Sequence, residues 1–463
     1  MSTTPLDTDG VPVSDFVYRM ITRWGWSMVG AYYSLEVCGE PFPERAGVVL
    51  VAGHRNGLAD AALLMNTTHR PLRFLVKYKL MSMPVLGPII TRSGAVPIYR
   101  KKDGVNMSRN AEAFTAVHKA LARREVITIF PEGSSHSEPN LGDMKSGAAR
   151  MALGALEETK GSTPLAIQPV GFVYSERDRF RSHLTAVIGK PIDPADYAAD
   201  YATNPRSTVE RLTADLRAGI CAASLELDDW SDLPGIELAE RLRPGAGISR
   251  AERSSELARG LAWLRERRPD RAQRLEALAR ELDQQLGRAH RLPEALSGQA
   301  QPRWIAAALG LLGLAVSTAV YLPPAVLARV IGLVARPTAD KLVTTQLLSA
   351  FVLFPLWVAF ALATAQVRGG VAALSLTALT LGACAWFAKR YWPRMQAWRA
   401  RIARALTPGA DDTAWQASAA RMGQELDRLE RFGARPGSSL RPHEQHSTHQ
   451  TGSNNIQSRA NLR

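Results

Sequence analysis

Short apolar segments alternate with stretches of helical periodicity over roughly the first 190 residues. The apolar segments are continuous and rich in β-branched residues, which is typical of strands covered on both faces. They span residues 33–37, 48–52, 73–76, 95–99, 126–130, 166–174 and 184–188, with helical stretches at 59–66, 106–122 and 146–158. This alternation predicts a layered α/β domain with a mostly parallel sheet, whose ligands contact the loops at the strand ends.

Three runs without a charged residue follow later in the chain, at 304–328, 342–367 and 369–388. Each is long enough to cross a hydrocarbon layer about 30 Å thick, which takes about 20 helical residues. We therefore predict a C-terminal all-α region of transmembrane helices, in preference to buried helices of a large soluble core.

The charges beyond the last run predict its orientation. A cluster of basic and aromatic residues follows it, at Lys389, Arg390, Tyr391, Trp392, Arg394, Trp398, Arg399, Arg401 and Arg404. The positive-inside rule places this end in the cytoplasm, so a cytoplasmic catalytic domain needs an even number of crossings. Either Pro323-Pro324 folds the first run into a hairpin, or one of the runs is re-entrant.

The remaining segments complete the predicted organisation. Residues 16–33 carry large apolar side chains every four positions, which predicts a helix that packs on the core, with a bilayer interface as the alternative. Residues 207–210 form a capping box that opens a helix, and Pro269 separates the two helices of a hairpin. The predicted parts are a disordered end at 1–15, the α/β domain at 16–200, a helical connector at 201–300, transmembrane helices at 301–390, a basic juxtamembrane helix at 391–432 and a disordered tail at 433–463.

The charge and composition of the chain limit the classes of partner that it could bind. A formal charge of +14 and a pI near 10.0 over 463 residues favour polyanions, either anionic lipid or nucleic acid. The uncharged runs favour membrane lipids, and the catalytic half lacks basic residues interleaved with stacking aromatics, so we expect no nucleic-acid partner. The scattered Cys38, Cys221 and Cys384 suit a reducing compartment and lack metal-like spacing. The polar N-terminus lacks the features of a signal peptide, so we expect a catalytic domain on the cytoplasmic face of a multi-pass membrane protein.

Three short elements of the sequence carry side chains suited to catalysis or binding. The first of them contains a histidine and a carboxylate. Residues 53–60 read Gly-His-Arg-Asn-Gly-Leu-Ala-Asp and contain His54 and Asp60. A carboxylate beside an imidazole fixes its tautomer and stabilises its cation, which lets the imidazole take a proton from a hydroxyl. His54 and Asp60 are therefore the candidate catalytic residues.

The other two elements offer groups that bind phosphate. Arg100 ends the segment 94–100, and Glu132, Gly133 and Ser134 follow Phe130-Pro131. A guanidinium and the backbone N–H groups of a Glu-Gly-Ser turn can hold a phosphate, with Glu132 accepting hydrogen bonds that shape the turn. Lys145, before the predicted helix start, either adds charge to this site or serves only the fold.

The order and spacing of these elements resemble the family of glycerol-3-phosphate and lysophosphatidate acyltransferases, over roughly residues 30–195. A fourth element of that family matches the apolar segment 166–172. The resemblance implies that His54 and Asp60 are catalytic, that Arg100 binds the substrate phosphate, and that the Glu132-Gly133 turn completes the phosphate site.

One spacing distinguishes this chain within the family it resembles. Five residues separate His54 from Asp60, where the commonest form has four. A subset similar to the yeast glycerol-3-phosphate/dihydroxyacetone-phosphate acyltransferases has a His-x-Asn-x-x-x-Asp form, which His54-Arg55-Asn56 fits. Because six helical positions turn about 600°, His54 must lie on the loop before a helix that carries Asp60.

The resemblance implies a membrane-bound O-acyltransferase of phospholipid synthesis. It would move a fatty acyl group from acyl-CoA or acyl-carrier protein, used as co-substrate, to 1-acylglycerol 3-phosphate or glycerol 3-phosphate, and we expect no metal and no resident cofactor. A serine hydrolase is disfavoured, because the Gly-x-Ser-x-Gly motif is absent around Ser134 and Ser135 beside His136. The alternative is a catalytically inactive membrane-tethered lipid-binding or scaffold protein of the same fold.

Overall fold

The computed structural model describes residues 15–84, 86–100, 107–175, 182–242, 248–289, 304–335, 338–406 and 412–431. The predicted disordered tail, and all but the last residue of the predicted disordered N-terminus, lie outside these ranges.

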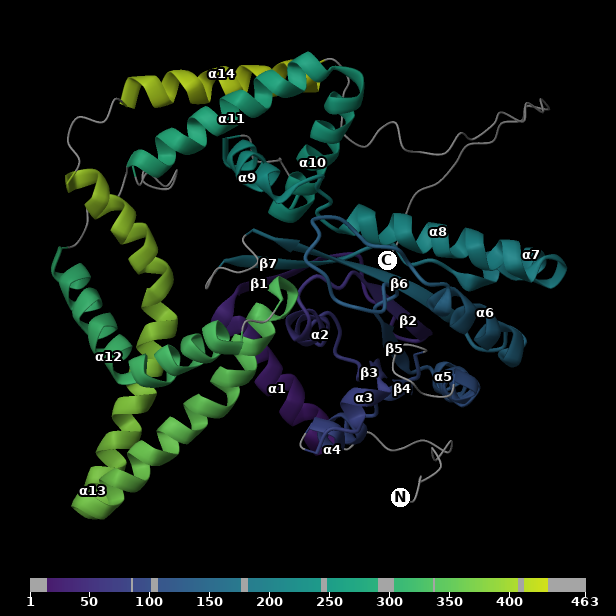
Figure 1. The fold of residues 1–463 in the computed structure, drawn as a ribbon, viewed down its shortest axis with the longest axis horizontal. Coiled ribbons are helices and arrows are strands. Elements are labelled where there is room, and N and C mark those ends of the chain that lie inside the picture. The colour runs from purple at the N-terminus through teal and green to yellow at the C-terminus, as the bar shows by residue number, and fades with distance from the viewer. Residues whose placement is uncertain are drawn as a thin grey trace, which may run out of the picture.

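A seven-stranded sheet forms the centre of the N-terminal domain (Figure 1). Its strand order is β1-β7-β6-β2-β5-β3-β4, and every pairing is parallel except that of β6 with β7. The strands are β1 (Ser34–Gly39), β2 (Gly47–Ala52), β3 (Leu72–Lys77), β4 (Val96–Ile98), β5 (Val126–Ile129), β6 (Leu165–Tyr174) and β7 (His183–Ile188). Each predicted strand is present, so the prediction of a mostly parallel α/β domain is confirmed.

Helices cover both faces of the sheet. Val49 and Val51 of β2 pack on one face with α5 (Asn110–Ala122), α6 (Gly147–Thr159) and α8 (Pro205–Ala223). Val48 and Leu50 of β2 pack on the other face with α1 (Asp15–Tyr32) and α2 (Leu58–Leu64). This two-sided burial is the reason that the strands are continuous apolar runs. The burial of Val29 in the same core agrees with the prediction that the first helix packs on the domain.

The boundary predicted at residue 200 is wrong, because α8 belongs to the α/β domain. Leu212, Leu216 and Ile220 of α8 are fully buried in the same core as β2. The helix also begins earlier than the predicted capping box. Asn204 is the N-cap, its side chain accepts a hydrogen bond from the Ser207 N–H at 3.2 Å, and proline occupies the first helical position.

Other helices complete the chain. Two short helices that the sequence analysis did not predict, α3 (Tyr78–Met81) and α4 (Leu86–Arg92), lie between β3 and β4. The short α7 (Ala198–Thr203) precedes α8. A further helical group contains α9 (Leu233–Leu242), α10 (Arg250–Arg267), α11 (Pro269–Ala289) and α14 (Asp412–Arg431), and its α9 and α10 share an apolar cluster with β6 and β7. Pro269 separates α10 from α11 as predicted.

The predicted juxtamembrane helix over 391–432 is wrong as a single element. Its first part is the end of α13 (Ala339–Leu406), and its second part is α14, which packs on α9 and α11. Met422 and Leu426 of α14 lie in one apolar cluster with Leu238 and Leu282. The helices α9 and α11 therefore cover the apolar face of α14.

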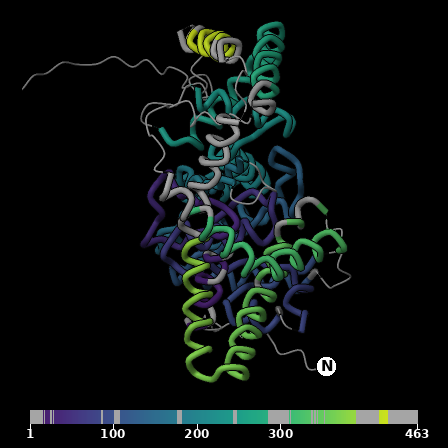
Figure 2. The backbone as a smooth tube through the Cα atoms, turned by 90° about the vertical axis from the view of Figure 1, so that its left-hand side faces the viewer, coloured from purple at the N-terminus to yellow at the C-terminus, as the bar shows by residue number. Residues whose placement is uncertain are grey.

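The three uncharged runs lie on two helices, α12 (Trp304–Ala335) and α13 (Figures 1 and 2). Pro323 and Pro324 lie inside α12, so the predicted alternative of a hairpin at these prolines is wrong. The chain reverses direction within α13, where Gly370 has φ 62° and ψ −153°. Two stretches, Leu312–Ala335 and Thr344–Ala388, are long and apolar enough to cross a membrane, and only 17% and 6% of their most apolar windows are buried.

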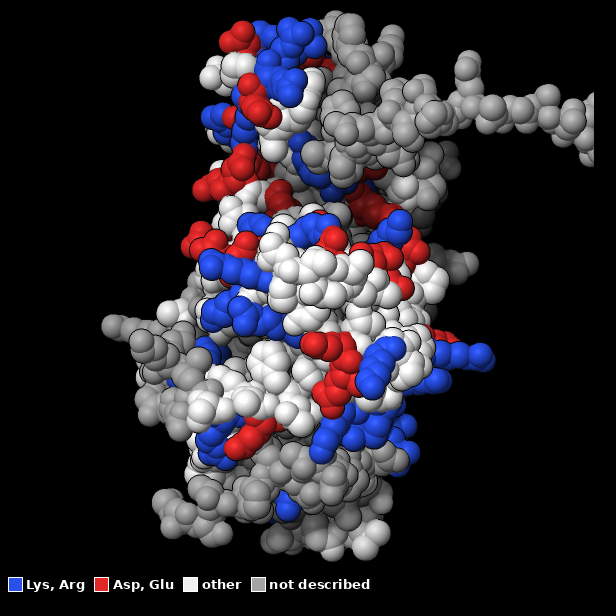
Figure 3. Space-filling view, turned by 90° about the vertical axis from the view of Figure 1, so that its right-hand side faces the viewer, with Lys and Arg blue, Asp and Glu red and all other residues white. Residues whose placement is uncertain are grey.

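The surface of the α/β domain differs from these helices. On the face turned away from α12 and α13, basic and acidic side chains are interspersed (Figure 3). Some form ion pairs, such as Arg211 with Asp200 at 2.6 Å and Arg206 with Glu210 at 3.2 Å. This is the pattern of a solvated surface rather than of a polyanion-binding stripe.

Candidate active site

The loops after three parallel strands meet at one edge of the sheet. His54 lies two residues after β2, Arg100 two residues after β4, and Glu132 three residues after β5. The carboxyl ends of neighbouring parallel strands lie at the same edge of a sheet. The topology therefore brings together three elements that are far apart in the sequence.

His54 is placed to act as a base. Its Nδ1 lies 3.1 Å from Oδ2 of Asp60, and its ring stacks on Phe130 with the centroids 4.0 Å apart. Because a carboxylate oxygen only accepts hydrogen bonds, Nδ1 carries the hydrogen and Nε2 has the lone pair that can take a proton. The side chain is 17% exposed, so a substrate can reach it.

Asp60 is fully buried and is held by several donors. Its Oδ2 accepts hydrogen bonds from His54 and from the Asn56 N–H at 2.7 Å, and its Oδ1 accepts one from the Tyr174 hydroxyl. Burial raises the pKa of Tyr174 well above its usual value, and the Asp60 carboxylate raises it further. Tyr174 therefore stays protonated and donates, and these donors stabilise the negative charge of Asp60 in a site without water contact.

The longer spacing between His54 and Asp60 is accommodated at Gly57. This residue has φ 51° and ψ −122°, a conformation that side chains disfavour. The helix α2 begins at the next residue, so Asp60 lies in its first turn and His54 stays on the preceding loop, as predicted. Asn56 is buried and its amide donates to the Tyr33 hydroxyl at 2.8 Å, which fixes the loop to the end of α1.

Glu132 joins the loops of the site to each other. Its Oε1 accepts the His54 N–H at 2.6 Å, and its Oε2 accepts the Gly142 N–H at 2.9 Å and contacts His136 Nε2. The His136 N–H donates in turn to the His54 carbonyl at 3.1 Å. Glu132 thus accepts backbone hydrogen bonds, as its predicted structural role requires. Its position beside the His54 backbone shows that it shapes the His54 loop as well as the Gly133 turn.

Acid pH is expected to weaken the hydrogen bonds by which Glu132 joins the loops of the site. Burial acts to raise the pKa of Glu132, but the hydrogen bond and charge of His136, with the N–H groups of His54 and Gly142, leave that pKa below its usual value. Glu132 therefore contributes stability that is present above about pH 4.3, the ordinary glutamate pKa, and is lost as the pH falls through the lower folded value. Urea unfolding of the wild type and of Glu132→Gln at pH 7 and pH 3.5 checks this. The difference in the free energy of unfolding between them should shrink at the lower pH, and an unchanged difference would contradict it.

Two cations flank the Gly133 turn. Arg100 Nη1 donates to the Gly133 carbonyl at 2.9 Å. Gly133 has φ 75°, and the Lys145 side chain occupies the space into which a side chain at position 133 would project. The half-buried Ser134 follows this turn. The sequence pattern predicted that the Gly133 N–H faces a phosphate, but this N–H donates to the Phe130 carbonyl at 3.0 Å inside the turn. The charge available to an anion therefore comes from Arg100 and Lys145.

A second set of contacts at the site was missed by the sequence analysis. Arg55, only 3% exposed, donates to the Leu225 carbonyl at 2.7 Å and pairs with Glu226. Glu226 also accepts the Leu141 N–H at 2.7 Å. The segment after α8 thus connects the loop of His54 to the loop after the Gly133 turn. The one local signal was an arginine beside the candidate base, and nothing in the sequence indicates its partner 171 residues later.

The contacts of His136 disfavour a serine hydrolase at this site. His136 is engaged by Glu132 and by the Glu138 N–H, so it is not placed as the base for Ser134 or Ser135. Within the described ranges, no cluster of three or more His, Cys, Asp or Glu side chains is arranged to hold a metal ion.

A sequence model of the family described as "Acyltransferase" matches residues 34–173. This range runs from the first residue of β1 to the last but one residue of β6, and it contains all seven candidate residues named from the sequence. Residues 34–173 are an acyltransferase domain. The acyltransferase domain defined by this match leaves out Tyr174 and Glu226, which contact Asp60 and Arg55 from beyond its end.

Comparisons with individual proteins found partial similarities. The chain is 34% identical over 134 residues to glycerol-3-phosphate O-acyltransferase 2 of Saccharomyces cerevisiae, covering 29% of this chain and 18% of the relative. It is 33% identical over 130 residues to glycerol-3-phosphate O-acyltransferase 1 of the same yeast, covering 27% and 17%. The chain thus spans less than a fifth of the length of these relatives. Among solved structures it is similar to the 1-acyl-sn-glycerophosphate acyltransferase PlsC of Thermotoga maritima, with 17% identity, coverage of 44% and 79%, and a TM-score of 0.32.

Proposed function

We propose that the acyltransferase domain transfers a fatty acyl group from an acyl thioester to a hydroxyl of a glycerol phosphate. The donor is acyl-CoA or acyl-carrier protein, and the acceptor is glycerol 3-phosphate or 1-acylglycerol 3-phosphate. The observation that carries the proposal is the contact of His54 with a fully buried Asp60 that three donors hold in place. Because the two yeast relatives are named as glycerol-3-phosphate O-acyltransferases, we place glycerol 3-phosphate first.

The proposed reaction is a direct displacement at the thioester carbonyl. His54 Nε2 takes the proton of the acceptor hydroxyl as its oxygen attacks the carbonyl carbon, while Asp60 stabilises the imidazolium. The tetrahedral intermediate then expels the thiolate, which takes the proton from His54 as the C–S bond breaks. The products are the ester and the free thiol, and the base returns to its starting state without a covalent acyl-enzyme.

Arg100 and Lys145 are proposed to hold the phosphate of the acceptor. Both flank Gly133, whose turn is joined to the His54 loop through Glu132. A phosphate bound there would fix the distance between the acceptor hydroxyl and His54. Positioning of this kind supplies a large part of the rate of a two-substrate reaction.

The Arg100→Ala variant is expected to raise the KM for glycerol 3-phosphate by roughly 10- to 100-fold, since a hydrogen bond to a charged group contributes about 1.5–3 kcal/mol. Arg100→Lys should recover part of this loss, because lysine keeps the charge but not the planar fork. Steady-state kinetics at saturating donor measure both. Arg92→Ala, at an exposed position on α4, is the control. A defect confined to the KM of the donor would contradict the assignment.

We further propose that the enzyme is membrane-bound, with the acyltransferase domain at the cytoplasmic face. The support is the exposure of large apolar side chains on α12 and α13, such as Val334 at 76%, Val367 at 86% and Leu379 at 72%. Apolar surface of this extent is unfavourable in water and favourable in a bilayer. The basic residues at the end of α13 support the orientation.

The second candidate, an inactive lipid-binding scaffold of the same fold, is disfavoured by the intact base and its carboxylate. A protein that only binds lipid has no need of a buried Asp60 that orients His54. Purified protein in detergent, assayed with both acceptors against both donors, tests the proposed function. Ester formation in any pairing supports transfer, and lipid binding without turnover in every pairing supports the scaffold.

A further inference from the structure

The beginning of α13 contacts the helix that carries Asp60. The Thr344 hydroxyl oxygen accepts the backbone N–H of Leu58 at 3.0 Å. Leu58 is the first residue of α2, and the N-cap Gly57 has no side chain with which to accept this hydrogen bond. The first N–H groups of a helix have no acceptor within the helix. Thr344 therefore supplies, from 286 residues away, the cap that the local sequence lacks.

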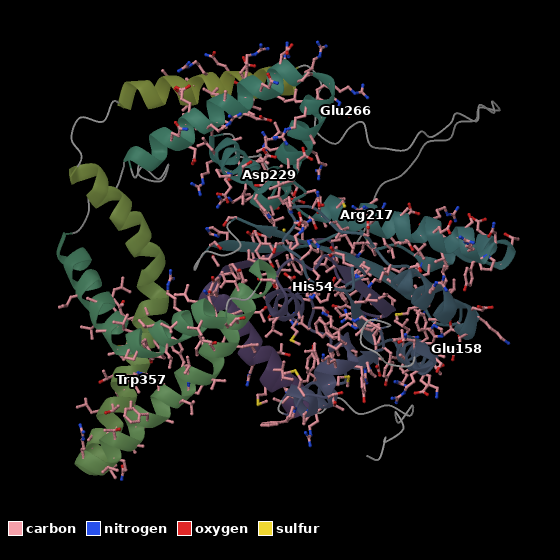
Figure 4. All side chains as sticks on the ribbon, viewed as in Figure 1. His54, Glu158, Arg217, Asp229, Glu266 and Trp357 are labelled. Atoms are coloured by element: carbon pink, nitrogen blue, oxygen red, sulfur yellow. The ribbon has the colours of Figure 1, made fainter. Side chains whose placement is uncertain are left out.

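The next residues of α13 reach the same loop by a second route. Gln346 Oε1 accepts a hydrogen bond from the Tyr32 hydroxyl at 3.2 Å. The ring of Tyr32 meets that of Tyr33 edge-on at 4.7 Å, and the Tyr33 hydroxyl accepts from Asn56 in the His54 loop. Leu347 is 5% exposed and lies in the apolar core of the acyltransferase domain. In Figure 4, His54 lies near the end of α13 that approaches the domain, and Trp357 lies farther along that helix.

We propose that Thr344 is a positioning residue for acyl transfer, and that the active site is complete only when α13 is docked on the acyltransferase domain. The inference rests on the proposed function. Asp60 is two residues beyond Leu58, so fraying of the first turn of α2 would displace its carboxylate from His54. A misplacement of about 1 Å can cost up to about 10²-fold in rate.

Thr344 also lies at the start of a possible membrane-spanning stretch. It is the first residue of the apolar stretch Thr344–Ala388, the longer of the two that could cross a membrane. The residue that caps the catalytic helix thus begins an apolar stretch that is long enough to cross a bilayer farther along α13. The site would be assembled at the membrane boundary, where the acyl chains of its substrates and product reside.

Full-length wild type, Thr344→Val and Thr344→Ser in detergent test the inference with glycerol 3-phosphate and acyl-CoA. Valine keeps the shape but loses the acceptor, so kcat should fall by about 3- to 30-fold, the factor expected for the loss of a helix cap. The KM for glycerol 3-phosphate should stay unchanged, because Arg100 and Lys145 are untouched. Serine keeps the hydroxyl and should restore kcat. The matched control is Thr364→Val, since the Thr364 hydroxyl is exposed and donates only within its own helix, to the Phe360 carbonyl.

Amide hydrogen exchange over residues 57–64 gives a readout that does not depend on turnover. Exchange should be faster in Thr344→Val and unchanged in Thr364→Val. Unchanged exchange in Thr344→Val would overturn the cap, and faster exchange with wild-type kcat would overturn its role in positioning. If the wild type transfers no acyl group in any pairing while exchange still responds to Thr344→Val, the proposed function fails and the docking of α13 on the catalytic loop stands.

Discussion

The His54→Ala variant is expected to lower the rate of acyl transfer by about 10²- to 10⁴-fold, because it removes the general base of the reaction. Asp60→Asn should cost a comparable factor. The asparagine amide keeps the shape of the side chain but loses the charge that orients His54 and stabilises its cation. Initial rates at saturating acyl-CoA and glycerol 3-phosphate, and again with 1-acylglycerol 3-phosphate, measure both losses.

The chain offers a matched control for this experiment. His118 Nδ1 lies 2.9 Å from Glu158 Oε2, a histidine–carboxylate contact like that of His54, but between α5 and α6 and away from the site (Figure 4). His118→Ala should leave turnover near the wild-type value. If His54→Ala retains near-normal turnover with both acceptors at an unchanged melting temperature, the proposed mechanism is wrong.

A protein that ends after residue 298 is expected to lose stable membrane attachment. It lacks α12 and α13, and long apolar helices bind a bilayer far more strongly than one interfacial helix or a basic patch. Any remaining binding through basic side chains should weaken as salt rises, because ions screen exposed charges. Fractionation of membranes at low and high salt and at alkaline pH measures this, and truncated protein that stays in the pellet under all conditions would show that another part of the chain anchors it.

The structure adds a second expectation for the same truncation. From the sequence, the α/β domain should fold alone, because its strands and helices end before the apolar runs. The truncation, however, removes Leu347 from the core, the cap on Leu58, and the α14 residues that cover Leu282. We therefore expect a soluble, folded protein with reduced stability and reduced kcat in detergent. A truncated protein with wild-type kcat would contradict the role of α13 in the site.

Much of the domain could be predicted because a buried strand or helix has a recognisable pattern of apolar residues in its own sequence. The strands β2, β5 and β6 are covered on both faces, so each consists mostly of apolar residues and can be recognised without knowledge of its neighbours. His54 could likewise be assigned to a loop, because a six-residue separation from Asp60 does not fit one helix face. The order of the motifs was sufficient to indicate the acyltransferase family.

Roles that depend on a distant partner could not be predicted in this way. The prediction that the Gly133 N–H binds a phosphate was wrong, because this N–H donates to a carbonyl within its own turn. The capping box predicted at 207–210 does not start the helix, because Asn204 caps it three residues earlier and Pro205 occupies its first position. In both cases several local patterns are compatible with the sequence, and packing selects one of them.

By itself the sequence determined where apolar side chains must be covered, and hence the strands, the core helices and the three uncharged runs of the C-terminal region. It also determined which residues could take a proton or bind a phosphate. Only the tertiary structure decided that Tyr174 donates to Asp60, that Glu226 pairs with Arg55, and that Thr344 caps α2. The physical reason is that periodicity records how a residue is buried, whereas a hydrogen bond between residues more than 100 positions apart depends on the path of the chain between them and leaves no pattern at either end.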